Sequence, residues 1–406
     1  MTVSARIVVQ PQEPAPLQII ELDLPAPGPH QVVVKQYASG VCHSQLHQMH
    51  NPRQNPIVLG HESTGEVLSV GSEVSHVAPG DTVMVTWVPR DAANTDRAPS
   101  PAAISLPDGS VARSQNVFTW ADKTIADEQY VVKVDANIKR DVTSIIGCAV
   151  MTGAGAVENT AKVQAGESVV IFGVGGVGLS AVVAAKELGA DPIIAVDLDD
   201  EKLAFATKFG ATHTINAKNE DAIKTIKSLT TNPAKRSFMG NPIAGADYAF
   251  DCIGLKQTME QIVPAVKNGF FGAEPGGTAV LVGVPQTPVE LNASDILVNE
   301  KKFIGSIGGS CVPDRDFPKY LNWYENGKLN LDVMVTERFS IDQINEATKA
   351  LENGIDAGHD LERLSKTLHH SEASIRGKLV SMKLYDQYLE KQVGLGEVKF
   401  EEWRKL

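Results

Sequence analysis

Residues 167–190 have the sequence ESVVIFGVGGVGLSAVVAAKELGA, which runs from a β-rich strand through a glycine turn into an apolar helix. The turn, GVGGVG at 173–178, fits the pattern G-x-G-x-x-G. Glycines in this position let the chain turn tightly and let a pyrophosphate approach the helix N-terminus, where amide groups and the helix dipole favour negative charge. The segment therefore predicts a dinucleotide site. The alternative is that the glycines serve only the close packing of strand and helix.

The strand that follows, PIIAVD, ends at Asp197, 19 residues after Gly178. A carboxylate at this place can accept hydrogen bonds from both hydroxyls of the adenosine ribose, and it would repel a 2′-phosphate. We therefore expect NAD rather than NADP as the dinucleotide.

The pattern around this unit divides the chain into three regions. From 150 to 308 strands alternate with helices, which predicts a doubly wound parallel sheet. Residues 1–149 contain short strands separated by Gly and Pro, which predicts a small barrel or sandwich. Residues 309–406 are mixed and helical. The fold class is therefore α/β, and two domains are expected because 406 residues are too many for one compact core.

Three local features stand apart from this plan. Residues 88–115 are rich in Pro, Ala, Ser and Asp and predict a long loop that closes with a hairpin at Asp108-Gly109. An amphipathic helix begins at Ile341 and should stop at Asn353-Gly354. The charged tail at 382–406 could be a lid, an intersubunit helix pair or an ordinary surface helix.

The composition restricts the partners of the protein. A net charge of −12 disfavours general binding to nucleic acid or to an anionic membrane surface. The chain has no apolar run of about 18 residues, and because residues 1–14 lack a charged start followed by an apolar core, we expect no secretory signal. Four cysteines in so long a chain do not suggest a disulfide framework, so we expect reduced thiols and a cytoplasmic location.

Two cysteines and one histidine form a possible ligand set. Cys42 lies in GVCHSQLHQ at 40–48, His61 follows 19 residues later, and Cys148 immediately precedes the dinucleotide domain. Two thiolates and one imidazole are a Cys₂His set, which binds zinc and leaves one tetrahedral position open for water or substrate. Taken singly, each residue has an ordinary interpretation, since a lone buried cysteine is usually a small hydrophobe and a lone histidine a satisfied polar group.

The surroundings of these residues match a known family. GHESTGEVLSVGSEV at 60–74 fits G-H-E-x-x-G-x-x-x-x-x-G-x-x-V at every fixed position. With GVCHS before it, then GCAVMTG and GVGGVG after it in the same order and spacing, the chain resembles the zinc-dependent medium-chain alcohol dehydrogenases over about residues 5–381. The resemblance implies a GroES-like β-barrel catalytic domain and a Rossmann domain, with coenzyme and substrate held between them.

The resemblance also assigns roles. Cys42, His61 and Cys148 would hold the catalytic zinc, and Glu62 would lie behind it as an outer or transient ligand. Ser44 would bond the substrate oxygen, and His47 would form the outer end of a proton relay. The residues expected near the coenzyme are His43, Thr152, Gly173, Gly175, Gly176, Val177, Gly178, Asp197, Lys202 and Arg376.

Trp87 matches a position that narrows the substrate pocket, which favours primary alcohols, although it could be a core tryptophan. Arg53 and Arg90 could meet an anionic substrate, but solvated surface charge is the simpler interpretation.

The chain departs from the family at two places. Gln45 stands where the family usually has the aspartate that orients the zinc-ligating histidine; its amide could still accept a hydrogen bond from His61 but adds no charge. Many members also bind a structural zinc through four cysteines in the lobe that here spans 88–120, which contains none. We therefore expect one zinc per chain, and we interpret Cys252 and Cys311 as free packing thiols.

The expected activity is reversible hydride transfer between an alcohol, preferably primary, and NAD. The alternatives are a dehydrogenase of a thiol–formaldehyde adduct or polyol, and a non-catalytic NAD-binding sensor or structural protein, which only Gln45 favours. A zinc-free reductase of the same superfamily would lack the Cys₂His set. KKFIGSIGGS at 301–310 resembles the edge strand that pairs two Rossmann sheets, so a homodimer or homotetramer is expected.

Overall fold

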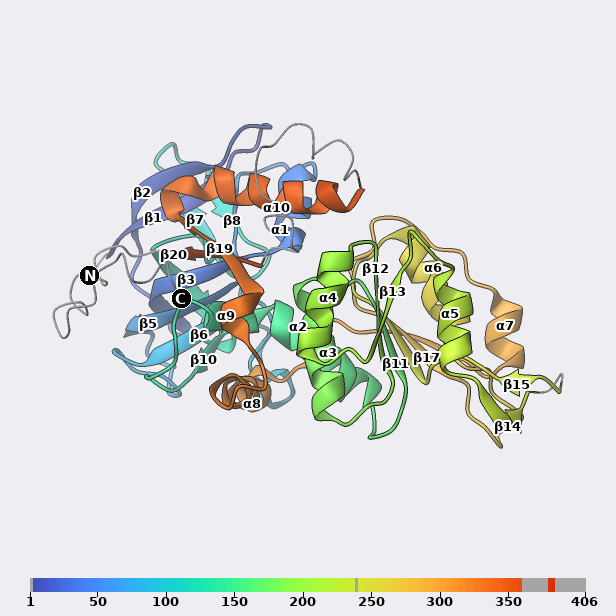
Figure 1. The fold of residues 1–406 in the computed structure, drawn as a ribbon. Coiled ribbons are helices and arrows are strands. Elements are labelled where there is room, and N and C mark those ends of the chain that lie inside the picture. The colour runs from blue at the N-terminus through green and yellow to red at the C-terminus, as the bar shows by residue number, and fades with distance from the viewer. Residues whose placement is uncertain (1–2, 238–239, 360–378, 384–406) are drawn as a thin grey trace, which may run out of the picture.

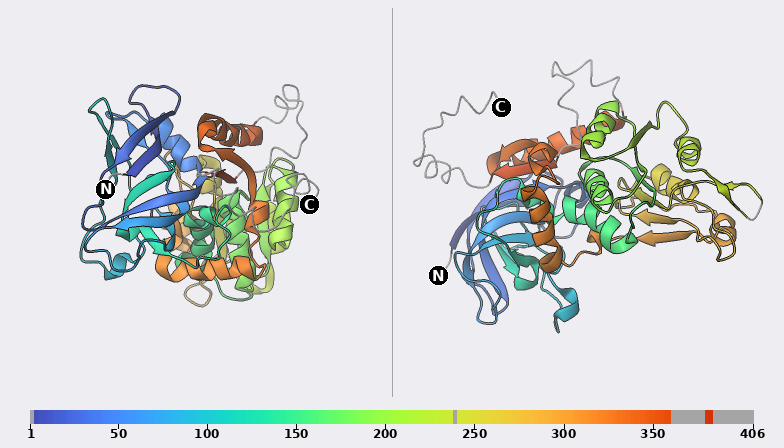
Figure 2. Two further views of the ribbon diagram at one scale, coloured as in Figure 1. Left: turned by 90° about the vertical axis from the view of Figure 1, so that its left-hand side faces the viewer. Right: turned by 60° about the horizontal axis from the view of Figure 1, so that its bottom comes forward.

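The computed structural model describes residues 3–237, 240–359 and 379–383. It contains two domains side by side, with helices α2 (Ala149–Gly155) and α3 (Gly176–Glu187) at their junction (Figures 1 and 2). One domain consists mainly of β-sheets and the other has a parallel sheet between helices, so the prediction of an α/β fold is confirmed. Among the helices of the described ranges, none combines the length and apolarity that a membrane span requires.

The first domain is built from two mixed sheets. Their strands run in the orders β2-β1-β4-β8-β7 and β10-β6-β5-β3-β20-β19, and β9 also pairs with β3. The bounds are β1 (Val3–Gln10), β2 (Gln18–Leu24), β3 (Gln31–Val41), β4 (Ile57–Val58), β5 (Glu62–Val70), β6 (Thr82–Thr86), β7 (Ala103–Ser105), β8 (Val111–Arg113), β9 (Lys123–Asp127), β10 (Val131–Lys133), β19 (Val335–Ser340) and β20 (Leu379–Lys383).

Strand β3 organises this domain. It pairs antiparallel with β5, β9 and β20, so it joins segments from three parts of the chain. The colours of Figure 2 show the result, since blue N-terminal strands lie beside orange and red C-terminal elements. The end of β3 and the beginning of β5 therefore lie close together, and these are the positions that carry Cys42 and His61.

The second domain is a six-stranded parallel sheet in the order β13-β12-β11-β16-β17-β18. Alternate residues of β11 belong to different cores: Val169 and Ile171 face one, and Val170 and Phe172 face the other. A strand buried on both sides needs helices on both sides, as in a doubly wound sheet. The chain moves outward from β11 to β13 and then crosses to β16, so the switch in direction lies beside β11, where such sheets bind ligands.

The strands of this sheet are β11 (Val169–Phe172), β12 (Ile193–Asp197), β13 (His213–Asn216), β16 (Tyr248–Asp251), β17 (Thr278–Leu281) and β18 (Lys302–Gly305). A separate hairpin pairs β14 (Asn232–Arg236) with β15 (Pro242–Ile243). The remaining α-helices are α1 (His43–His50), α4 (Asp200–Phe209), α5 (Ala222–Leu229), α6 (Lys256–Ala265), α7 (Ala293–Val298), α8 (Pro313–Glu325), α9 (Leu331–Met334) and α10 (Ile344–His359). Short helical turns are η1 (Ala92–Asn94), η2 (Glu128–Tyr130), η3 (Thr143–Gly147), η4 (Ala156–Ala161), η5 (Gly308–Ser310) and η6 (Ile341–Gln343).

Helix α2 packs directly on the start of α3. A Cβ atom added to Gly153 would lie 1.9 Å from the carbonyl oxygen of Val177, so only glycine permits this approach. The contact brings the segment that carries Cys148 and Thr152 beside the glycine turn.

The lobe at 88–120 is held by hydrogen-bonded ion pairs. The predicted hairpin is confirmed, because β7 and β8 pair antiparallel around Gly109, whose φ of 86° suits glycine. Arg97 donates to both carboxylate oxygens of Asp127 at 2.7 and 2.8 Å and to Glu128 at 3.2 Å. The amide of Ser100 also donates to Asp127, at 2.9 Å. Asp127 therefore holds the lobe against the sheet strand β9 that carries it.

Two expectations about exposed features were wrong. Helix α10 continues to His359, past the stop predicted at Asn353-Gly354, because a glycine inside a helix costs only about 1 kcal/mol and does not end it. Arg53 and Arg90 are not simply solvated: Arg53 donates to the carbonyl of Pro11 at 2.9 Å, and Arg90 forms an ion pair with Asp314. Of the tail at 382–406, only the two residues in β20 lie in the described part.

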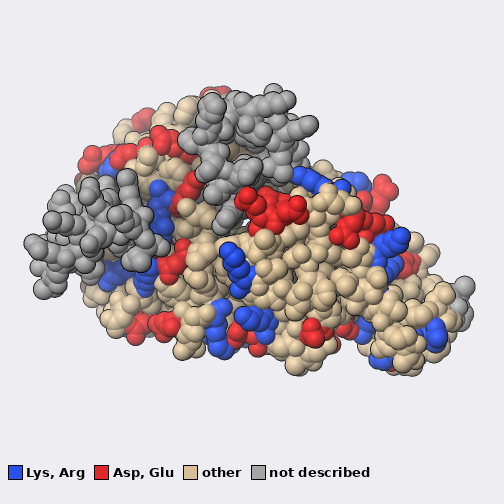
Figure 3. All heavy atoms as spheres, viewed as in Figure 1, with Lys and Arg blue, Asp and Glu red and all other residues tan. Residues whose placement is uncertain are grey.

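Lysine, arginine and acidic side chains are interspersed on the face drawn in Figure 3, and no broad basic patch covers the described residues visible there. This face agrees with the expectation from net charge.

Candidate metal and coenzyme site

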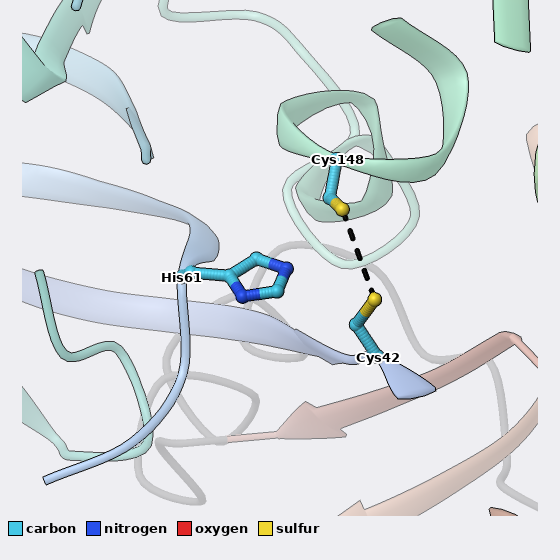
Figure 4. A group of neighbouring side chains, drawn as sticks. All are labelled: Cys42, His61 and Cys148. Carbon is cyan, nitrogen blue, oxygen red and sulfur yellow. Dashed lines mark hydrogen bonds between the residues drawn. The ribbon is translucent and has the colours of Figure 1, made fainter. Parts of the chain in front are cut away.

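Three side chains from three elements converge at one end of the first domain. Cys42 follows β3 and begins α1, His61 immediately precedes β5, and Cys148 lies between η3 and α2. The two sulfur atoms are 3.8 Å apart, and one ligand atom from each residue lies within 4.8 Å of the others (Figure 4). In the described part of the chain, this is the only such group of histidine, cysteine or acidic side chains.

The imidazole of His61 is oriented for coordination. Its Nδ1 atom lies 2.9 Å from Nε2, the side-chain amide nitrogen, of Gln45. Its Nε2 atom is buried and has no hydrogen-bond partner among the described residues. A buried polar atom without a partner costs about 1–3 kcal/mol, a cost that a bound cation would remove. Two sulfur donors and one nitrogen donor suit zinc, so the residues fit the expected metal.

The thiols are electrostatically unequal. The pKa of Cys42 is lowered well below its ordinary value, chiefly because Cys148 donates a hydrogen bond to it, with His61 and Ser44 adding to the effect. The pKa of Cys148 is raised by the same contact and by burial, while the Trp87 indole opposes the shift. One thiolate is therefore readily available, and a thiolate is the form that binds metals.

Glu62 lies behind the cysteines. Its side chain is 1% exposed, and its Oε2 atom has no hydrogen-bond partner within the described ranges. Burial, followed by the charge of Cys42, raises the pKa of Glu62 well above its ordinary value. A Cβ atom added to Gly40 would lie 2.2 Å from its Oε1 atom. Gly40 thus makes room for the carboxyl group, a role that sequence reasoning missed although Gly40 opens the GVC motif.

The glycine turn forms a cradle for a pyrophosphate, and each glycine has its own reason. Gly173 adopts a φ of 85°, and a Cβ added to Gly178 would lie 1.8 Å from the carbonyl oxygen of Gly173. At Gly175 an added Cβ would meet none of the described atoms within 4 Å, so the backbone is open there. Gly176 and Val177 begin α3, whose first amides have no capping side chain from the described residues. The arrangement fits a phosphate at the helix N-terminus.

Asp197 lies beside this turn at the end of β12. Its carboxylate accepts hydrogen bonds from the amide of Val174 at 3.0 Å and from that of Leu198 at 2.7 Å. Lys202 lies in the first turn of α4. Desolvation lowers the pKa of His43. The negative charge of Cys42 opposes this shift, whereas the positive charges of His47 and Lys202 add to it.

The remaining predicted residues are distributed around this junction. The hydroxyl of Ser44 donates to the sulfur of Cys42 at 3.5 Å. The ring of Trp87 packs edge-on against that of His61, with centroids 6.3 Å apart. Trp87 therefore borders the ligand group, which is formed by Cys42, His61 and Cys148. The hydroxyl oxygen of Thr152 is buried without a partner among the residues described. Arg376 lies outside the described residues.

Sequence reasoning also missed Gln286. Its side-chain amide donates to Nδ1 of His47 at 3.0 Å, which joins the loop after β17 to helix α1 of the other domain. The available signal was its position just after a strand of the parallel sheet, since ligands of such sheets bind at the carboxyl ends of the strands.

The two other cysteines lie apart from this group. Both are free thiols. Cys311 is buried and donates to the carbonyl of Met151 at 3.2 Å, and burial raises its pKa to about 12. Burial likewise raises the pKa of Cys252. These environments suit packing thiols rather than ligands.

Comparison with known proteins gives consistent matches. The family model for an alcohol dehydrogenase GroES-like domain matches residues 28–136, and that for a zinc-binding dehydrogenase matches residues 176–326. S-(hydroxymethyl)glutathione dehydrogenase of Paracoccus denitrificans is 32% identical over 366 residues, which are 84% of this chain and 94% of that protein. Alcohol dehydrogenase class-3 of Cereibacter sphaeroides is 31% identical over 376 residues, 86% of this chain and 97% of that protein.

The fold is also found in solved structures. Benzyl alcohol dehydrogenase of Acinetobacter calcoaceticus superposes with a TM-score of 0.73 at 26% identity, covering 94% of this chain and 100% of that one. An alcohol dehydrogenase zinc-binding domain protein of Burkholderia ambifaria has a TM-score of 0.75 at 27% identity, covering 95% and 100%.

Proposed function

The chain belongs to the zinc-dependent medium-chain alcohol dehydrogenases, and from this premise we propose that it transfers hydride reversibly between a primary alcohol and NAD. The family is one of oxidoreductases that use zinc and NAD or NADP with small-molecule substrates. The observation that carries the proposal for this chain is the buried, unpaired Nε2 atom of His61 beside the sulfurs of Cys42 and Cys148.

These three residues would hold one catalytic zinc per chain. When bound, zinc polarises the substrate oxygen, and the nicotinamide ring accepts or returns hydride. Ser44 lies beside Cys42, so its hydroxyl can bond the substrate oxygen and accept its proton while giving up its own. His47, which is partly exposed, would be the outer end of the relay that releases a proton to solvent. Trp87 would narrow the pocket beside the metal, which favours slender primary alcohols.

Three features support NAD rather than NADP. The carboxylate of Asp197 lies against the glycine turn, where it would repel a 2′-phosphate. The next residues are Leu198 and Asp199, so no arginine follows Asp197 directly. The first turn of α4 adds Asp200 and Glu201 against the single cation Lys202.

A thiol–formaldehyde adduct is the second candidate substrate. It is favoured by the S-(hydroxymethyl)glutathione dehydrogenase of Paracoccus denitrificans, to which 84% of this chain aligns. Such an adduct presents a primary hydroxyl, so it would make the same use of the ligand group and Ser44. A polyol is the third candidate. The non-catalytic alternative is disfavoured, because the relatives that cover most of the chain are dehydrogenases.

The test combines metal analysis with NADH absorbance on the full chain. We expect about one zinc per chain and NADH formation with primary alcohols, more slowly with secondary alcohols and with NADP. Adding the hydroxymethyl adduct of glutathione to the panel separates the first two candidates by their kcat/KM. Absence of zinc after metal is supplied, together with absence of turnover on the whole panel, would refute the proposed function.

We also propose a homodimer formed through β18, with a homotetramer as the alternative. β18 lies at the edge of the parallel sheet, and Ile307 just beyond it is 78% exposed. Light scattering on the purified protein tests this assembly. Replacing Ile307 by Asp should shift the mass toward the monomer; an unchanged mass at every concentration would contradict this interface.

The reduced state that Cys42 and Cys148 need fits a cytoplasmic location.

A further inference from the structure

The side-chain amide of Gln45 lies between the backbone amide of Gly60 and the ring of His61. The residue lies in α1 and is 2% exposed. Its Oε1 atom accepts a hydrogen bond from the amide of Gly60, and its Nε2 atom lies 2.9 Å from Nδ1 of His61. The amide group of Gln45 therefore presents its NH₂ group to the imidazole, and Nδ1 accepts. This is the reverse of the expectation that Gln45 accepts a hydrogen bond from His61.

Coordination by His61 demands the opposite polarity. A histidine that binds a metal through Nε2 carries its proton on Nδ1 and donates it to a neighbouring acceptor. The N–H of His61 would then point at the NH₂ group of Gln45, which has no acceptor to offer, while the oxygen of Gln45 remains bonded to the amide of Gly60. Rotating the amide by half a turn brings its oxygen to His61, but it turns the NH₂ group against the N–H of Gly60.

The backbone at Gly60 has little room to move and so relieve this conflict between hydrogen-bond donors. Gly60 has a φ of 90°, and a Cβ atom there would lie 2.4 Å from the amide nitrogen of Trp120. The segment is thus tightly enclosed. A carboxylate has two acceptor oxygens and would satisfy both donors at once, which is what the usual aspartate provides.

We propose that Gln45 is a positioning residue that weakens zinc binding, because its NH₂ group, and not its oxygen, faces the ring nitrogen that must carry a proton when His61 coordinates the metal. The inference rests on the proposed function, since it takes Cys42, His61 and Cys148 as the ligands. Partners of metal-ligating histidines typically change metal affinity by about 10- to 100-fold. Zinc in this protein is accordingly more exchangeable than in a protein with a carboxylate at this position.

The first experiment measures zinc affinity on the metal-free full chain, by competition with a chromogenic chelator at one pH and salt concentration. Gln45→Glu preserves side-chain length and supplies the second oxygen, so it should bind zinc about 10- to 100-fold more tightly than the wild type. Gln45→Met supplies no acceptor and should bind no more tightly than the wild type. The matched control is Gln48→Glu, which adds the same charge to α1 at a side chain that bonds to Gln115; it should leave the affinity unchanged.

The second experiment uses the wild-type protein, so it does not depend on the folding of a variant. Nuclear magnetic resonance of ¹⁵N-labelled histidine should find His61 with its proton on Nε2 in the metal-free protein and on Nδ1 after zinc is added. A proton on Nδ1 before zinc is added would overturn the inference, as would equal zinc affinities of the wild type and Gln45→Glu. If neither protein binds zinc, the proposed function itself fails.

Discussion

The ligand group and the lobe at 88–120 both connect distant parts of the chain, but they do so differently. In the lobe, Arg97 donates to both oxygens of Asp127, and those oxygens also accept the amides of Ser100 and Gln129. In the ligand group, Nε2 of His61 is left without a partner among the described residues. In the lobe the protein itself supplies the partners of the buried Asp127 carboxylate, whereas the ligand group leaves its imidazole nitrogen for a cation.

A buried group whose partners all come from the protein contributes to stability. A buried nitrogen without a partner indicates a missing ligand when, as at His61, it also lies beside other metal-binding side chains.

The largest effect is expected from removing a proposed ligand. Replacing Cys148 by Ala should lower kcat/KM for alcohols by at least about 1,000-fold, because metal polarisation of the substrate supplies several kcal/mol of transition-state stabilisation. Bound zinc, measured by atomic absorption, should fall in parallel. The matched control is Cys311→Ala, which removes a buried thiol outside the group and should retain zinc and activity. Full activity of the Cys148 variant would show that the proposed ligand group is not needed for catalysis.

A loss of stability without loss of metal is expected at the lobe. Replacing Arg97 by Met leaves Asp127 buried without its cation and should lower the free energy of unfolding by about 3 kcal/mol. Urea denaturation measures this change, and zinc content should stay constant. Arg113→Met, at an exposed position in β8, is the control and should have little effect. Loss of zinc from the Arg97 variant would show that the lobe and the ligand group are not independent.

The stabilisation by Arg97 should also depend on pH in a defined direction. Burial raises the pKa of Asp127, but hydrogen bonds from Arg97, Ser100 and Gln129 outweigh it and lower the pKa overall. A carboxyl whose pKa is lowered on folding stabilises the protein fully above its unfolded pKa of about 3.9, and this contribution is lost as the pH falls through the lowered value. The difference in Tm between wild type and Arg97→Met should therefore be constant above about pH 5 and shrink below about pH 4. A difference that grows on acidification would contradict this assignment.

A smaller effect is expected at Asp197, which combines both behaviours. Its carboxylate is held by backbone amides, yet it lies at the open glycine turn. Asp197→Ala should weaken NAD about tenfold, a cost of about 1.4 kcal/mol, and relatively favour NADP. The ratio of kcat/KM for the two coenzymes measures the shift. Asp199→Asn, two residues further on, is the control; an unchanged ratio in Asp197→Ala would assign this carboxylate to structure alone.

The sequence was sufficient for features that depend on local spacing or on the family motifs. The strand, glycine turn and helix at 167–190 were predictable, because the positive φ of Gly173 and its close contact with Gly178 are constraints within that segment. The approach of Cys42, His61 and Cys148 was expected from the resemblance, since the spacing of three distant residues does not by itself define a common point.

The remaining features depend on contacts between distant segments, which no local pattern encodes. Whether Gln45 donates to His61 or accepts from it depends on the amide of Gly60. The contact of Gln286 with His47 requires the docking of two domains. The role of Arg97 depends on its ion pair with Asp127, and no local sequence pattern links these two residues. Helix α10 continues past Gly354 because a single glycine costs a helix only about 1 kcal/mol, which the local pattern Asn353-Gly354 does not reveal.

The close approach of Gly153 to Val177 has a mechanical consequence. Because no side chain at Gly153 separates α2 from the first residues of α3, we expect the segment after Cys148 and the glycine turn to move together. Across the junction, an exposed hydrogen bond joins Gln286 to His47 of α1. Opening of the site would therefore separate these two side chains more easily than it would separate α2 from α3.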